Sequence, residues 1–140
     1  MHSTKRGDTY VVRLEIGEDV VESLLALAAR EGIGAAEITG LGASKYAQVG
    51  VLDPATGQYQ SAQSSSFLEV VSLVGNLSVK DAAPYLHLHA LLADPVTHEV
   101  LAGHLNALTV GATAEIFVRT LPGSLERRVC DVTGLNILDI

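Results

Sequence analysis

Three histidines in the second half of the sequence have the spacing of metal ligands. His87 and His89 are separated by one residue within the apolar run Tyr85–Ala93, and His104 follows a glycine in a second apolar run. Alternate side chains of a β-strand point to the same face, so His87 and His89 would share one face of a strand. Their Cβ atoms would be ~6–7 Å apart, and one zinc ion with metal–nitrogen bonds of ~2.0–2.1 Å can bridge that separation.

A short turn at residues 94–99 would bring the third histidine to the same place. The turn predicts that residues 85–93 and 100–105 are neighbouring strands, which returns His104 to the level of the histidine pair. Gly103 has no side chain, so the backbone there can approach the site closely. Three histidines with an open fourth position are typical of catalytic rather than structural zinc sites. The spacing alone also fits histidines that only hydrogen-bond to backbone or water.

Few other residues suit chemistry at such a site. Glu69 and Glu115 are candidates to accept hydrogen bonds from the histidines, or to act as a general acid or base, only if they face the metal. The alternative is that they are solvated or paired carboxylates on strands. Arg13 could hold the carboxylate of a ligand, or lie at a sheet edge or a subunit interface. We expect His2 and His98 on the surface.

One helix and many strands are expected to position these residues. Asp19 and Glu22 have the spacing of a capping box, apolar residues follow at helical spacing, and Gly32 suits a C-terminal cap, which predicts a helix over about 19–31. Asp53–Gly57 predicts a turn, and the polar residues 58–66 a loop or solvated edge. Strands are expected at residues 9–16, 36–42, 47–52, 67–77, 85–93, 100–105, 108–119, 125–131 and 135–139.

This pattern predicts an α+β fold, with one main helix packed on a curved, largely antiparallel β-sheet. A chain of 140 residues is the length of one domain. We expect residues 1–8 to form a flexible N-terminal segment and residues 9–140 to form a single domain.

Composition excludes several classes of function. The chain is 48% hydrophobic and 18% charged, a balance that favours burial of apolar surface between subunits. Its net charge of −7 disfavours direct binding to nucleic acid. No apolar run approaches the ~20 residues that cross a bilayer, and the N-terminus has no signal-peptide pattern. A single cysteine, Cys130, excludes an internal disulfide and fits a reducing compartment, so a cytoplasmic location is expected.

Five ordered motifs resemble the plants-and-prokaryotes-conserved (PPC) domain family, over about Tyr10 to Arg119. They are Gly40–Gly42, Phe67–Leu77, Leu86–Asp94, Leu101–Leu105 and Ala112–Ile116. The resemblance implies an α+β fold similar to that of acetolactate decarboxylase and, in prokaryotic members, a compact homotrimer. It also implies a metal, zinc, held by His87, His89 and His104.

The sequence departs from the family pattern in two respects. Ala102 stands where the motif before the third histidine usually has a glycine, and the basic AT-hook of plant members is absent. The favoured interpretation is a zinc-binding PPC-domain protein that forms a homotrimer and has room for a small ligand at the metal. One alternative is a DNA-binding regulatory module. The other is a zinc-dependent lyase or hydrolase acting on a small oxo- or hydroxy-acid, and whether the site is catalytic stays open.

Overall fold

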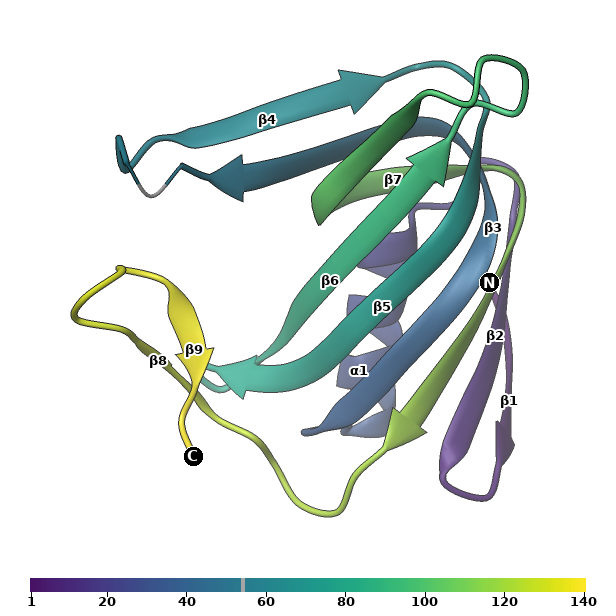
Figure 1. Cartoon of the computed structure of the whole chain (residues 1–140). Coiled ribbons are helices and arrows are strands. Elements are labelled where there is room, and N and C mark those ends of the chain that lie inside the picture. The colour runs from purple at the N-terminus through teal and green to yellow at the C-terminus, as the bar shows by residue number, and fades with distance from the viewer. Residues whose placement is uncertain (54) are drawn as a thin grey trace.

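The computed structural model describes residues 1–53 and 55–140 and has the expected α+β composition, one helix with a mostly antiparallel sheet (Figure 1). Its elements are β1 (His2–Arg6), β2 (Thr9–Glu15), α1 (Val20–Glu31), β3 (Ala36–Leu52), β4 (Tyr59–Ser64), β5 (Leu68–Lys80), β6 (Ala83–Ala93), β7 (Val100–Thr120), β8 (Arg127–Val129) and β9 (Asn136–Leu138).

Two long strands, β3 and β7, form the framework of the sheet. They pair antiparallel from Ala36 opposite Thr120 to Gly50 opposite His104. β3 also pairs with β5, β5 pairs with β6, and β6 pairs with β7. Because β7 pairs with β3 as well, these four strands form a closed circle of pairings. The sequence predicted two shorter strands in place of each of β3 and β7. The pairing shifts register at several points, one of them at Gly42. Each shift lets the strand continue past glycine and polar residues at which the sequence suggested that it ends.

Two polar strands form the ends of the sheet. Residues 2–6, expected as a flexible segment, instead form β1 and pair with β2 in regular register. Residues 59–64, within the region expected as a loop or solvated edge, form β4 and pair with β3, which agrees with the second alternative. Both lie at the ends of the sheet order, and their side chains are almost all exposed, so no apolar alternation marks them. Within the turn predicted at residues 53–57, Gly57 N–H donates to the Asp53 carbonyl at 2.8 Å, and Pro54 lies outside the described residues.

The helix covers one face of the sheet and leaves the other face uncovered. α1 buries Val20, Leu24, Leu27 and Ala28 against the inward side chains of the sheet (Figure 1). It ends at Gly32, whose φ of 63° is the left-handed conformation that glycine adopts without strain. Among the described residues, no helix has the length and apolar character needed to cross a membrane.

The N-terminus of α1 is tied to β7 by one carboxylate. Asp19 Oδ1 accepts a hydrogen bond from Glu22 N–H at 3.0 Å, which forms one half of the predicted capping box. Asp19 Oδ2 accepts from Leu108 N–H of β7 at 3.2 Å. The same side chain therefore caps the helix and joins it to the strand that carries His104.

Replacing Asp19 with alanine should lower the free energy of unfolding by about 1–2 kcal/mol, because two backbone N–H groups lose their acceptor. Urea unfolding measures the change. The matched control is Glu22→Ala, which removes a carboxylate from the same helical turn but keeps the cap, and it should cost less than about 0.5 kcal/mol. Equal losses in the two variants would contradict the role given to Asp19.

Candidate metal centre

The structure brings the three predicted histidines together on the face of the sheet opposite the helix. His87 and His89 point outward from β6, on either side of the buried Leu88. His104 of β7 is the direct cross-strand partner of His89. The ring centroids are 5.2 Å apart for His87 and His89, 5.3 Å for His87 and His104, and 5.9 Å for His89 and His104.

Two glycines allow the strands to approach closely at this point. A Cβ atom on Gly75 of β5 would lie 2.0 Å from the carbonyl oxygen of His87, so only glycine fits beside that residue. Gly103 has a φ of 155°, and its Cβ would lie 2.9 Å from the carbonyl oxygen of Gly50. The close backbone approach at Gly103 is therefore made to Gly50 of β3, whereas the sequence predicted an approach to the metal site.

The donor atoms fit a metal such as zinc. One ring nitrogen from each histidine lies within 4.8 Å of the other two. Nitrogen ligands of tetrahedral zinc are about 3.3 Å apart, so small rotations of the side chains would suffice to reach that geometry. Among the described residues, no carboxylate or thiol joins the cluster. A metal held here would keep at least one coordination position free of side chains from this cluster.

The surroundings favour neutral imidazoles, which are the form that binds metal. Burial lowers the pKa of His104, and the neighbouring His89 and Arg127 lower it further. Burial is also the main cause of the lowered pKa of His87, followed by His104 and Arg127. Both rings should therefore be neutral at pH 7.

A cavity of about 830 Å³ adjoins the histidines. In the described part of the chain, its lining residues come from the β3–β4 ribbon, from Asn76 of β5, from β6 and β7, and from the C-terminal hairpin of β8 and β9. These elements can be followed in Figure 1. Tyr59 of β4 lies over Gly50 and donates a hydrogen bond from its hydroxyl to Asn106 Oδ1 at 3.0 Å. On the opposite side, Arg127 of β8 lies against Tyr85, with its guanidinium carbon 4.8 Å from the ring centroid.

Sequence reasoning missed these pocket residues. Tyr59 was in the segment expected as a loop or solvated edge, and the sequence predicted no role for Arg127. Each reaches the site through contacts between distant parts of the chain. No local spacing could have identified them.

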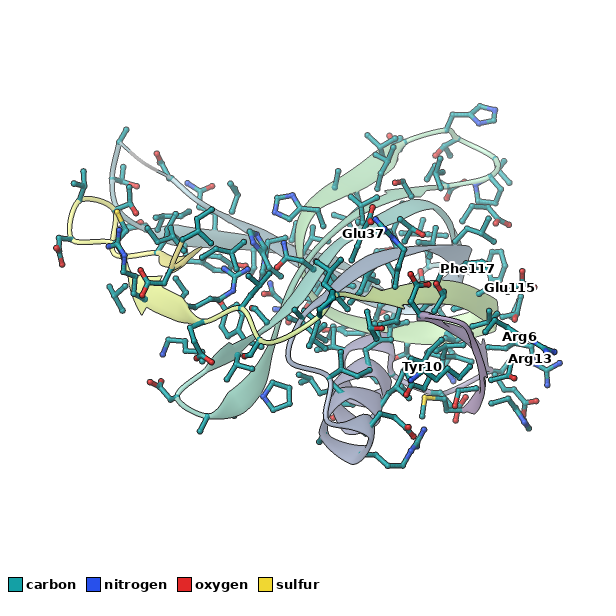
Figure 2. All side chains as sticks on the ribbon, turned by 90° about the horizontal axis from the view of Figure 1, so that it is seen from below. Arg6, Tyr10, Arg13, Glu37, Glu115 and Phe117 are labelled. Carbon is teal, nitrogen blue, oxygen red and sulfur yellow. The ribbon has the colours of Figure 1, made fainter. Side chains whose placement is uncertain are left out.

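The other candidate residues lie away from the cluster. Glu69 and Glu115 are exposed and do not line the cavity. Glu115 is the cross-strand partner of Arg13 where β2 pairs with β7, and Figure 2 shows both residues on one side of the molecule. Arg13 forms an ion pair with Glu15 at 3.0 Å. As expected, His2 and His98 are on the surface.

The fold and the cluster together define an α+β protein with a candidate three-histidine metal centre on the outward face of its sheet. The family model of the Plants and Prokaryotes Conserved (PCC) domain matches residues 1–122. The chain therefore belongs to this family, the same one that its ordered motifs indicated in the sequence.

Three solved structures of similar proteins cover almost the whole chain. A "putative DNA binding protein" from Bacteroides thetaiotaomicron is 28% identical with a TM-score of 0.94, covering 99% of this chain and 96% of that chain. The metal-containing protein AF0104 from Archaeoglobus fulgidus is 34% identical with a TM-score of 0.88, at coverages of 97% and 96%. A plant- and prokaryote-conserved protein from Pyrococcus horikoshii is 32% identical with a TM-score of 0.87, at coverages of 96% and 92%.

The expected relation to acetolactate decarboxylase extends to the fold alone. A protein of unknown function from Staphylococcus aureus, similar to alpha-acetolactate decarboxylase, is 12% identical with a TM-score of 0.57. It covers 90% of this chain, which spans 56% of that protein. No curated protein matches the sequence.

The lowered pKa values of His87 and His104 predict how the stability of the metal-free protein depends on pH. In the unfolded chain both histidines take up protons near pH 6.5, whereas in the folded chain their protonation is resisted. Their contribution to stability is fully present above pH ~6.5. It is lost as the pH falls below ~6.5 and through the lower pKa values that the two histidines have in the folded protein.

Urea unfolding of chelator-treated protein at pH 7.5 and 5.5 should therefore show lower stability at pH 5.5. The double variant His87→Asn/His104→Asn should lose less stability over the same interval, because these two positions no longer titrate. An equal loss in both proteins would contradict the assignment.

Proposed function

We propose that this chain is a metal-binding protein that holds zinc through His87, His89 and His104. The convergence of three imidazoles from two adjacent strands carries the proposal, because their donor atoms lie within 4.8 Å of one another. The description of AF0104, 34% identical over nearly the whole chain, as metal-containing supports it. Zinc bound by three neutral imidazoles keeps its double positive charge and an open position that can polarise a ligand oxygen.

The chain's own residues set the limits on chemistry at this site. The three rings would hold a metal beside the cavity, and apolar side chains such as Val51 and Ile137 form part of the cavity's walls. In the described part of the chain, no Asp or Glu lines the cavity to take or give a proton. The arrangement therefore supports binding of a small ligand at the metal more strongly than it supports a lyase or hydrolase.

Protein purified without chelators should contain about one zinc ion per chain, and His89→Ala should lose most of it because one of three ligands is gone. Elemental analysis by mass spectrometry measures the ratio. His98→Ala is the matched control, since it removes an exposed histidine from the turn after β6 and should keep full metal content. Wild-type protein without bound metal would refute the proposal.

We further propose that the chain assembles as a homotrimer through the uncovered face of the sheet. Three large apolar side chains gather there around Thr39, which pairs with both Val74 and Phe117. Leu41, Val74 and Phe117 are 56%, 48% and 49% exposed, respectively. The ion pair between Glu37 and Arg119 borders this apolar patch, and Figure 2 shows Glu37 and Phe117 on the same side of the molecule.

The total exposed surface supports assembly. The isolated chain exposes 7688 Å², whereas a globular monomer of 14.7 kDa is expected to expose about 6,900 Å². Val74 is also the cross-strand partner of His89, so a second subunit on the apolar patch would lie next to the metal centre. The choice of a trimer rests on the family resemblance.

Light scattering coupled to size exclusion should give a mass of about 44 kDa, three times 14.7 kDa. Phe117→Glu should shift the protein to the monomer, because a carboxylate would be buried without a partner at the interface. Val96→Glu is the control, since Val96 is 83% exposed in the turn between β6 and β7 and lies off the patch. A monomeric wild-type protein, or a trimeric Phe117→Glu variant, would contradict this assembly.

A DNA-binding role is the alternative suggested by similar structures described as putative DNA-binding proteins. The net charge of −7 per chain opposes it, because affinity for duplex DNA comes mainly from basic groups that neutralise phosphates. The metal-binding proposal is therefore preferred.

A further inference from the structure

Arg127 occupies a fixed position beside the histidine cluster. Its Nε–H donates to Ser78 Oγ and one Nη2–H donates to Asn76 Oδ1, both at 2.7 Å and both on β5. One Nη1–H donates to the Asn136 carbonyl oxygen of β9, also at 2.7 Å. Asn76 is the cross-strand partner of His87, so the guanidinium group lies next to the metal centre.

The contacts of Arg127 leave part of its hydrogen-bonding capacity for a ligand. A guanidinium group has five N–H donors, of which three are used in the described contacts. By this count, each terminal nitrogen retains one N–H. Two N–H groups on the two terminal nitrogens suit the two oxygens of a carboxylate.

The charge of Arg127 has no counterpart within the described part of the chain. It forms no ion pair there, whereas its neighbour Arg128 is paired with Asp139 at 3.0 Å. Arg127 is the one Lys or Arg among the cavity's described lining residues, and none of those residues is acidic. A half-buried charge without a partner is costly, so an anionic ligand would be favoured here.

We propose that the cavity binds a small aliphatic carboxylate, whose carboxylate group is held by Arg127 beside the three-histidine centre. The aliphatic part would lie against apolar walls from the β3–β4 ribbon and the C-terminal hairpin, including Val51, Leu52, Leu135 and Ile137. This inference rests on the proposed metal site for the ligand's position, but the recognition of the negative charge depends on Arg127.

Isovalerate and isovaleramide test the inference, because they have the same shape and differ in charge. NMR titration of the zinc-loaded protein should show isovalerate binding at least about tenfold tighter than isovaleramide. Arg127→Gln should lower this ratio severalfold in the zinc-loaded protein, and in the metal-free protein it should bring the ratio close to one, because no other Lys or Arg is among the described lining residues. The matched control Arg128→Gln changes the adjacent arginine, which is paired outside the cavity, and should keep the wild-type ratio.

A purely structural role for Arg127 predicts a different result. If the arginine only held the hairpin, Arg127→Gln would weaken both ligands equally and leave the ratio unchanged, which would overturn the inference. Thermal unfolding checks that the variant is folded. Should it not fold, Arg127→Lys replaces it: the isovalerate affinity should fall severalfold because one ammonium group cannot supply a two-pronged contact, and an unchanged affinity would overturn the inference.

Repeating the titrations on chelator-treated protein separates the two proposals. The dependence of the isovalerate preference on Arg127 should persist without metal, although both ligands should bind more weakly. If the wild-type protein never binds zinc, the metal proposal fails. The role of Arg127 is then tested by the isovalerate preference of the metal-free protein alone. If zinc is bound and neither form prefers isovalerate, only the inference about Arg127 fails.

Discussion

The pairing of β3 with β7 holds this molecule together. It runs from Ala36 opposite Thr120 to Gly50 opposite His104, and its two ends serve different purposes. One end connects β7 to β2 and β3 to β5, which builds the wall that α1 covers. The other end places His104 between β3 and β6, where it meets His89. A shift in this pairing by one residue would turn His104 toward the opposite face and separate the cluster.

The site combines three histidines from the main sheet with an arginine from the C-terminal hairpin. His89 and His104 lie where their strands are paired on both sides, and His87 lies where β6 is paired with β5, so the positions of all three follow from the sheet register. Arg127 instead comes from the two-stranded β8–β9 sheet, which is separate from the main sheet. Its hydrogen bonds to Asn76 and Ser78 attach that hairpin to β5. The same side chain that closes the pocket wall thus also fixes the hairpin that carries it.

The parts of the site that depend on local sequence could be predicted, and the others could not. Alternation along β6 placed His87 and His89 on one face, and the short turn after Ala93 brought His104 back beside them. Both steps need only neighbouring residues and a hairpin. Arg127 depends on a contact between strands far apart in the chain, and its local sequence resembles an ordinary exposed pair.

The fold shows the same division. The helix was predicted to within a residue or two because its cap and its apolar spacing are local. β1 was missed, and β4 was predicted only as one of two alternatives, because their stability comes from backbone pairing at the sheet edges, with almost no buried side chains. The long β3 and β7 were predicted as separate pieces, since irregular register lets a strand continue through residues that usually end one.

The pocket's electrostatics link its two proposed ligands. A positively charged arginine near His87 and His104 disfavours their protonation, which keeps the imidazoles available for metal. The same arginine would repel a bound cation, and in the described lining no carboxylate offsets that repulsion. An anion between the metal and Arg127 would relieve it, so metal and anion should each strengthen the binding of the other. Because such coupling is reciprocal, the anion's gain in affinity from metal must equal the metal's gain from the anion.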